Sequence, residues 1–216
     1  MTASVTASLR AVTFDLDGTL YDAAAARRPI LWASFPRWRT LRVGRAVREE
    51  LRGRTFASGA ALRDEEARLV AERLEVEPAR ARARLDTVFD GDVVRALRSV
   101  GARPHATEAL AALAGRGVLL GVVSDRRVDA KLAALGLAEL PWRAKVSADD
   151  VGVLKPSPAL FHAACAAMGV APAEAAHVGD RVDTDEAGAR AAGMRSFLLG
   201  RDGDLTAICR ALFPAA

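Results

Sequence analysis

Groups that could take part in chemistry stand beside several short apolar segments of the chain. These positions are Asp15, Asp17 and Gly18 after residues 9–14, Ser124 and Asp125 after residues 118–123, Lys155 ahead of residues 158–168, and Asp180, Asp183 and Asp185 after residues 175–178. In open parallel sheets, ligands bind beyond the carboxyl ends of the strands. We therefore expect these polar groups to meet at one edge of a single sheet.

The residue types in this set favour phosphoryl transfer. Crowded carboxylates repel one another unless a cation neutralises them, and an incomplete cage of oxygen ligands is typical of Mg²⁺. The Ser124 hydroxyl, the Lys155 ammonium and the backbone amides of the adjoining turns can donate hydrogen bonds to an anion. The Asp15 carboxylate is a nucleophile at neutral pH that can form an aspartyl-phosphate. Asp17 can then protonate the leaving oxygen and later accept a proton from water.

Short apolar segments alternate with helical patterns over most of the chain. The expected strands are residues 9–14, 118–123, 144–146, 175–178 and 196–199. The expected helices cover residues 108–114, 128–135, 158–168 and 205–212, with a further helix ending at Gly193. Short buried strands that alternate with helices predict a parallel sheet that is covered on both faces. The predicted core is therefore α/β: a Rossmann-like, parallel, five-stranded sheet with helices on both faces.

The segment between the first and second expected strands has a different pattern. Residues 22–100 are rich in Ala, Arg, Leu and Glu, with apolar residues at helical spacing and no convincing strand. Glycine and proline positions divide this segment into about four helices. We therefore predict a helical cap domain at residues 22–100, inserted into an α/β core domain made of residues 1–21 and 101–216.

Four motifs, in this order, resemble those of the haloacid dehalogenase superfamily, and in particular its phosphatase-like members with a helical cap after the first motif. The motifs are Asp15-Leu16-Asp17-Gly18-Thr19-Leu20, Val122-Val123-Ser124-Asp125, Lys155-Pro156-Ser157-Pro158, and Val178-Gly179-Asp180 with residues 181–194. The resemblance covers about residues 8–21 and 100–200. Between these ranges the chain resembles the family only in the position and helicity of the insertion.

The resemblance implies a role for each residue of the predicted site. Asp15 resembles the nucleophile, which is also a Mg²⁺ ligand, and Asp17 resembles the general acid and base, whose carbonyl also binds the metal. The implied phosphate-binding groups are Gly18, Ser124, Asp125 and Lys155, and the further metal-binding groups are Asp180 and Asp185. Asp125 stands where many relatives have Asn, so its contact with substrate stays open. Asp183 adds a carboxylate that competes with Asp185 for the supporting role near the metal.

The function that the resemblance implies is Mg²⁺-dependent hydrolysis of a small phosphorylated metabolite through an aspartyl-phosphate. A phosphomutase on the same core and a non-catalytic binding protein of this fold stay open as alternatives. A haloacid dehalogenase needs no metal and usually lacks the second aspartate, so Asp17 and Asp180 argue against that activity. A phosphonate-cleaving relative uses a lysine of the cap, and residues 22–104 contain none. The sequence does not identify the substrate.

Composition favours a soluble, cytoplasmic protein. Hydrophobic residues make up 51% of the 216 residues, and no stretch approaches the roughly 20 apolar residues of a membrane span. The first residues lack the apolar stretch of a signal peptide. Two cysteines are too few for a disulfide framework. The net charge of +4 is spread among acidic neighbours, which argues against nucleic acid as a partner, while the oligomeric state stays open.

Residues 30–42 hold two groups of side chains that allow alternative interpretations. One group is apolar: Trp32, Phe35, Trp38 and Leu41. This group lines the entrance to the site in one interpretation, and in the other, which we favour, it forms the core of the cap or a dimer surface. The second group is basic and suits an anionic substrate: Arg37, Arg39 and Arg42. The three histidines are not spaced as metal ligands, so we expect structural roles for them.

Overall fold

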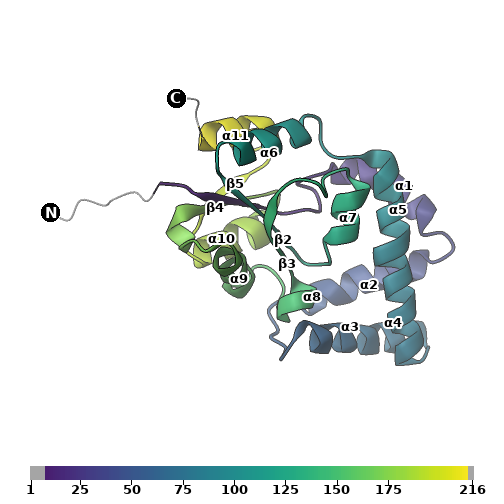
Figure 1. Cartoon of the computed structure of the whole chain (residues 1–216). Helices are drawn as coiled ribbons and strands as arrows, with labels where there is room; N and C mark the ends of the chain where they lie inside the picture. Colours follow the sequence, from purple (N-terminus) through teal and green to yellow (C-terminus); the bar gives the residue numbers. More distant parts are fainter. Residues whose placement is uncertain (1–7, 214–216) are drawn as a thin grey trace.

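The computed structural model describes residues 8–213, which fold around one five-stranded sheet (Figure 1). The strands are β1 (Ala11–Phe14), β2 (Leu119–Ser124), β3 (Trp142–Ser147), β4 (Ala175–Gly179) and β5 (Arg195–Leu198). Their order is β3-β2-β1-β4-β5, and every neighbouring pair is parallel. The predicted five-stranded parallel sheet is confirmed, and each predicted strand overlaps an observed one. The outermost residues of the predicted core, 1–7 and 214–216, lie outside the described part of the chain.

Strand β1 lies at the centre of the sheet, which explains its uncharged sequence. All four of its residues are buried. Ala11 aligns with Leu119 of β2 on one side and with Ala175 of β4 on the other. A strand that is enclosed on both faces and both edges has no room for charged side chains. From β1 the chain adds β2 and β3 in one direction, and β4 and β5 in the other, so the sheet has its switch point between β1 and β4.

Helices cover both faces of the sheet, as predicted. Figure 1 shows α6 (Ala106–Gly115) and α11 (Leu205–Leu212) together on one face, and α9 (Pro158–Met168) and α10 (Ala187–Ala191) on the other. Shorter elements complete the connections: α7 (Asp129–Ala134), α8 (Ala148–Val151), the 3₁₀-helix η2 (Pro172–Glu174) and the π-helix η3 (Val182–Glu186). Leu110 of α6 and Phe161 of α9 are fully buried, so both layers contribute to one hydrophobic core. Within residues 8–213, no helix is long and apolar enough to cross a lipid bilayer.

The segment between β1 and α6 contains helices and no strand of the sheet. Its elements are α1 (Ala23–Ala33), α2 (Trp38–Glu50), α3 (Gly59–Leu74), α4 (Pro78–Asp86), the π-helix η1 (Thr87–Asp92) and α5 (Val93–Val100). These elements form four continuous helical runs, as expected, because α4, η1 and α5 join into one run and Gly91 lies within η1 without ending it. Figure 1 shows α2, α3 and α4 grouped on one side of the molecule, next to α8. The division into a core domain and a cap domain stays a prediction.

The three aromatic rings near the turn between α1 and α2 are exposed. Trp32, Phe35 and Trp38 are 76%, 68% and 46% exposed, whereas Leu41 is buried. The interpretation of these rings as the core of the helical segment is therefore wrong, because α1 and α2 bury Ile30 and Leu41 instead. Their participation in a dimer surface stays a prediction.

Candidate active site

The predicted site forms where β1 and β4 end, at the switch point of the sheet. Asp15 follows β1 directly, and Asp180 follows β4 directly. Phe14 aligns with Val178, so the two aspartates leave the sheet from neighbouring strands. The backbone N–H of Asp15 donates to the carbonyl of Val178 at 2.9 Å, which extends the strand pairing into the site. The position of both carboxylates thus follows from the register of two strands.

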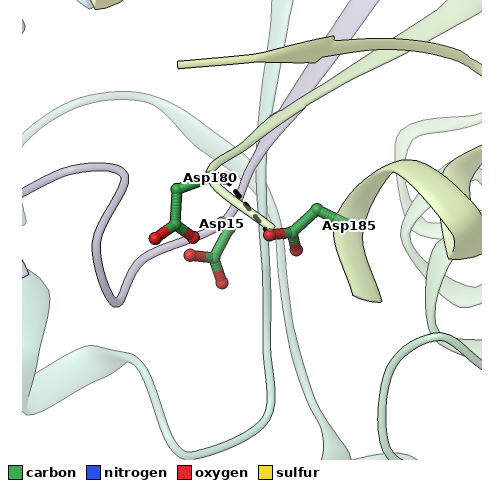
Figure 2. Close-up of side chains that lie close together, drawn as sticks. All are labelled: Asp15, Asp180 and Asp185. Carbon is green, nitrogen blue, oxygen red and sulfur yellow. Dashed lines mark hydrogen bonds between the residues drawn. The ribbon is translucent and has the colours of Figure 1, made fainter. Parts of the chain in front are cut away.

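Three carboxylates form a cluster at this edge of the sheet, which we call the carboxylate cluster. Asp15, Asp180 and Asp185 each place an oxygen within 4.8 Å of the others (Figure 2). Asp15 and Asp185 are buried, and Asp180 is exposed. Two glycines allow this close approach. A Cβ on Gly18 would lie 2.3 Å from Oδ2 of Asp180, and a Cβ on Gly179 would lie 2.4 Å from the Cβ of Asp185.

Lys155 supplies a buried cation to the carboxylate cluster. Its Nζ donates to Oδ1 of Asp15 at 2.5 Å and to Oδ1 of Asp185 at 2.6 Å. The three side chains are at most 5% exposed, so water screens these contacts poorly. Burial by itself would lower the pKa of Lys155, but the charges of Asp15 and Asp185 outweigh it and raise the pKa. Lys155 is therefore held in its charged form.

The two buried carboxylates that contact Lys155 have pKa values that are shifted in opposite directions. Burial raises the pKa of Asp15 against the opposing effect of Lys155, and the charge of Asp185 adds to the rise. Burial also disfavours the charged form of Asp185, but Lys155 and His177 outweigh it and hold the pKa below its usual range. One ammonium group thus neutralises only part of the negative charge that the cluster can carry.

Asp185 is fixed by groups from β4 and the following turn. Its Oδ2 accepts hydrogen bonds from the backbone N–H groups of Asp180 and Arg181 at 3.2 Å and 3.1 Å, the first of which is drawn in Figure 2. The Nε2 of His177, a buried residue of β4, lies 3.4 Å from its Oδ1. Asp183, by contrast, is exposed and pairs with Arg181 at 2.6 Å. Of the two candidates, the fold brings Asp185 into the carboxylate cluster.

Asp17 lies beside the carboxylate cluster and has partners of its own. The Nζ of Lys131 donates to its Oδ1 and Oδ2 at 2.7 Å and 2.6 Å, and the Tyr21 hydroxyl donates to its Oδ1 at 2.7 Å. Burial would raise the pKa of Asp17, but Lys131 and Tyr21 outweigh it and hold the pKa below its usual range. The Asp17 side chain is still 39% exposed. It is therefore a charged carboxylate within reach of a ligand.

Ser124 and Asp125 stand at the end of β2. Ser124 is fully buried, and its Oγ accepts from the backbone N–H of Arg126 at 3.3 Å. Asp125 accepts from the backbone N–H of Lys155 through Oδ1 at 2.9 Å, and from Arg52 through Oδ2 at 3.0 Å. Both oxygens of Asp125 therefore contact the protein itself, and the contact of Asp125 with substrate stays a prediction.

The donor set of the carboxylate cluster fits a divalent cation. Hard cations such as Mg²⁺ prefer oxygen ligands and keep part of their water shell, and the exposed Asp180 leaves one side of the cluster open to water. Burial and the charge of Asp185 raise the pKa of Asp180, a shift that a cation at this position would oppose. Asp15, Asp180 and Asp185 are the residues that could hold such an ion.

A cavity of about 490 Å³ opens beside Asp17 and Lys131. Residues of α1, α2, η1 and α5 line one side of it, and residues of the sheet edge line the other. Arg27 and Arg45 are part of this lining, and neither forms an ion pair or a side-chain hydrogen bond with another residue in the range 8–213. The cavity therefore presents two guanidinium groups that the protein does not neutralise.

The arginines that the sequence suggested for an anionic substrate lie elsewhere. Arg37, Arg39 and Arg42 do not line this cavity, and neither do the exposed aromatic rings. Arg37 instead pairs with Asp92 at 2.8 Å. The prediction that these three arginines face an anionic substrate is therefore wrong for this cavity. The helix faces that turn toward the sheet edge carry Arg27 and Arg45 instead.

Sequence reasoning missed several residues that contact the predicted site, among them Tyr21, Lys131 and Arg52. A signal existed for the first two, because Tyr21 is the only tyrosine of the chain and Lys131 is one of three lysines. Arg52 carried no such signal, since it is one of 31 basic residues of the chain and lies in a segment that is rich in arginine.

Comparisons with known proteins agree with this geometry. A family model described as haloacid dehalogenase-like hydrolase matches residues 9–193. The chain is 43% identical over 86 residues to haloacid dehalogenase-like hydrolase domain-containing protein 3 of Bos taurus. This match covers 39% of this chain and 34% of that protein. It is also 37% identical over 127 residues to a phosphoserine phosphatase of Thermus thermophilus. This second match covers 57% of this chain and 49% of that protein. The chain thus spans between a third and a half of the length of these curated relatives.

The similarity to a solved structure extends over nearly the whole chain. A 2-haloacid dehalogenase from Pseudomonas syringae pv. Tomato is 26% identical, with a TM-score of 0.63, and the match covers 94% of this chain and 96% of that one. The helical segment is therefore included in the likeness, together with the sheet.

Proposed function

The chain belongs to the haloacid dehalogenase-like hydrolase family, and on this premise we propose that it is a Mg²⁺-dependent phosphatase acting on a small phosphomonoester. One observation carries the proposal: Asp15, Asp180 and Asp185 gather within 4.8 Å, with Lys155 as their buried cation. The three carboxylates can carry more negative charge than the Lys155 ammonium neutralises. Such a site suits a divalent cation that binds together with a phosphate. The likeness to a phosphatase of Thermus thermophilus supports the same reaction class.

The first proposed step is transfer of the phosphoryl group to Asp15. A carboxylate oxygen of Asp15 attacks phosphorus, the bond from phosphorus to the leaving oxygen breaks, and the leaving oxygen takes a proton from Asp17. Lys155, 2.5 Å from Asp15, would stabilise the negative charge on the transferred group. The Ser124 hydroxyl and the Gly18 amide are proposed as further donors to the phosphate oxygens.

The second proposed step is hydrolysis of the aspartyl-phosphate. Water attacks phosphorus, its proton passes to Asp17, and phosphate leaves as the Asp15 carboxylate is restored. The contacts of Lys131 and Tyr21 support Asp17 as the base of this step, because they hold its carboxyl deprotonated. Asp17 needs a proton in the first step. We expect the negative charge of the substrate phosphate to draw Lys131 away from Asp17, so that Asp17 takes up a proton from water before the attack or keeps the one it accepted in the preceding turnover.

Mg²⁺ is proposed to bind the carboxylates of Asp15 and Asp180 and the backbone carbonyl of Asp17, with Asp185 in support. When bound, the ion would offset the repulsion between the Asp15 carboxylate and the substrate phosphate. Asp183 has no proposed role, because its carboxylate is occupied by Arg181.

The helical segment at residues 22–100 is proposed to act as a cap that selects the leaving group. The cavity of about 490 Å³ beside Asp17 is of a size that suits a small metabolite. Unpaired Arg27 and Arg45 in its lining favour a leaving group that carries a second anionic substituent.

Phosphate release from p-nitrophenyl phosphate, measured with Mg²⁺ and with EDTA, tests the proposal. We expect turnover with Mg²⁺ and a loss of at least about a hundredfold with EDTA, since the metal supplies several kcal/mol of charge stabilisation. A panel of phosphorylated metabolites, with phosphate release as the readout, would then identify the substrate. No turnover of any phosphate ester in the presence of Mg²⁺ would contradict the phosphatase assignment.

The likeness to a solved dehalogenase calls for a second assay. Chloride release from 2-chloropropionate would indicate a dehalogenase, and Asp17 and Asp180 argue against that result. A phosphomutase would move the phosphoryl group within its substrate instead of releasing phosphate to water. Phosphate release and chloride release therefore separate a phosphatase from a dehalogenase, and a phosphomutase is recognised by an isomeric phosphorylated product with neither release.

A further inference from the structure

The backbone of Lys155 is held from both sides by two side chains that also bind each other. Its N–H donates to Oδ1 of Asp125 at 2.9 Å, and its carbonyl accepts from Nη1 of Arg52. The same Nη1 of Arg52 donates to Oδ2 of Asp125 at 3.0 Å. Lys155, Asp125 and Arg52 thus form a closed ring of hydrogen bonds, which we call the Lys155 ring.

The Lys155 ring joins three distant parts of the chain. Arg52 follows α2, Asp125 follows β2, and Lys155 lies ahead of α9. The Arg52 and Asp125 side chains are 15% and 21% exposed, so their contact is more shielded than a surface ion pair. Glu49 accepts two further hydrogen bonds from Arg52, at 2.8 Å and 2.9 Å, which fixes the plane of the guanidinium. The ring is therefore a well-ordered connection between the helical segment and the Lys155 loop.

An aspartate at position 125 suits the ring better than an asparagine. Both of its oxygens face donors, the Lys155 N–H on one side and the Arg52 guanidinium on the other. A carboxylate accepts at both oxygens, whereas the amide of Asn would turn its own N–H₂ group toward one of these donors. The two donors that face Asp125 therefore favour a carboxylate at this position.

We propose that Arg52 is a positioning residue that acts through Asp125 and the Lys155 backbone to hold Nζ of Lys155 on Asp15 and Asp185. The contacts of Nζ are 2.5 Å and 2.6 Å long, so a backbone shift of about 1 Å would carry it out of hydrogen-bond range. Residues 22–100 then contribute to the chemical step as well as to substrate selection. The kinetic consequence rests on the proposed phosphatase function, while the positioning of Lys155 does not.

Kinetics of single and double variants test the positioning role. We expect Arg52→Gln to lower kcat for p-nitrophenyl phosphate by about ten- to a hundredfold, with a change in KM below about threefold, because a displaced ammonium stabilises the transition state less. Because Asp125 acts through the same ring, the variant carrying both Arg52→Gln and Asp125→Asn should lose no more than the worse single variant. The control Arg54→Gln removes a more exposed arginine that pairs with Glu65, and its kcat should stay within about twofold of wild type.

Hydrogen exchange provides a readout that does not depend on activity. The Lys155 N–H is protected by Asp125, so its exchange, followed by NMR, should become at least about tenfold faster in Arg52→Gln and stay unchanged in Arg54→Gln. Arg52→Lys keeps the positive charge but loses the planar guanidinium group, so kcat and the rate of Lys155 exchange should both lie between those of wild type and Arg52→Gln. This milder variant also serves as the test if Arg52→Gln does not fold.

The outcomes separate the inference from the proposed function. Faster Lys155 exchange in Arg52→Gln, in a protein that hydrolyses no phosphate ester, would support the positioning role and contradict the phosphatase assignment. Lower thermal stability with normal kcat and normal Lys155 exchange would overturn the inference and leave Arg52 a purely structural residue. Additive losses in the double variant would also overturn it, because they would show that Arg52 and Asp125 act separately.

Discussion

Two groups of largely buried charges lie near each other in this protein, and they differ in how the protein balances them. The carboxylate cluster sets Asp15, Asp180 and Asp185 against Lys155. The second group, which we call the arginine network, joins α2 and α3 to the segments after β2 and β3. Its members are Arg48, Glu66, Arg126 and Asp149.

The arginine network is neutralised within the protein. Arg48 pairs with Glu66 and Asp149 at 2.6 Å each, and Arg126 pairs with Glu66 at 2.6 Å. The Arg126 guanidinium also lies 3.5 Å from the centre of the Phe89 ring. Two cations meet two carboxylates, so the charges of the network balance one another within the protein.

The difference shows what each group of charges does. A balanced buried network holds its elements together, and removing one partner is costly because a charge is left unpaired. An unbalanced cluster works against stability in the free protein and gains when a cation or substrate arrives. The arginine network therefore connects the helices to the sheet edge, and the carboxylate cluster is where we expect a ligand.

Asp15→Asn should have the largest effect on activity and no cost in stability. An amide is a poor nucleophile, so we expect turnover to fall by at least about a thousandfold. Removing one carboxylate from the crowded cluster should leave the melting temperature in the absence of Mg²⁺ equal to that of wild type or higher. Steady-state kinetics and circular dichroism on the same preparation measure both. More than about a tenth of wild-type activity in a folded variant would contradict the assignment of Asp15.

Glu66→Gln should show the opposite pattern. It leaves the buried Arg48 and Arg126 short of negative charge, so we expect a loss of about 3 kcal/mol in the free energy of unfolding, measured with urea. Glu65→Gln, at the preceding and more exposed acidic residue, is the matched control and should cost less than about 1 kcal/mol. Equal losses in the two variants would show that the arginine network is no stronger than a surface ion pair.

Mg²⁺ should stabilise the protein through the carboxylate cluster alone. At about ten times the dissociation constant, a bound ion adds about 1.4 kcal/mol to the free energy of unfolding, which is measurable as a rise in melting temperature. We expect this rise in wild type and in Glu66→Gln, and its loss in Asp180→Asn. A rise that persists in Asp180→Asn would place the ion outside the carboxylate cluster.

Arg45→Gln should have the smallest effect, confined to the choice of substrate. Phosphoglycolate and ethyl phosphate differ by a carboxylate in place of a methyl group, so their ratio of kcat/KM reports on a second anionic group. We expect Arg45→Gln to lower this ratio by about five- to tenfold, since an exposed charge pair contributes about 1 kcal/mol. Arg42→Gln, on the same helix but outside the cavity lining, should leave the ratio unchanged. An unchanged ratio in Arg45→Gln would remove this arginine from substrate selection.

Sequence alone was enough to predict the sheet and the residues at its edge. Strands enclosed on both faces leave continuous apolar runs, and β1 and β4 are such strands. Asp15 and Asp180 directly follow these strands, so their convergence needed only the parallel topology. The helical nature of residues 22–100 was also predictable from periodicity, although not every glycine of this segment ends a helix, since Gly91 lies within η1. Packing outweighs the intrinsic cost of a single glycine within a helical run.

Only the tertiary structure decided which charges pair. Lys131 reaches Asp17 across 114 positions of sequence, and Arg52 reaches Lys155 across 103. The exposure of Trp32 was decided in the same way, by the direction in which α1 turns its faces. Periodicity shows which face of a helix is apolar, but it does not show which loop lies opposite a given arginine. The energy of a charge pair depends on a distance of a few ångströms, and that distance exists only once the helices have packed against the sheet edge.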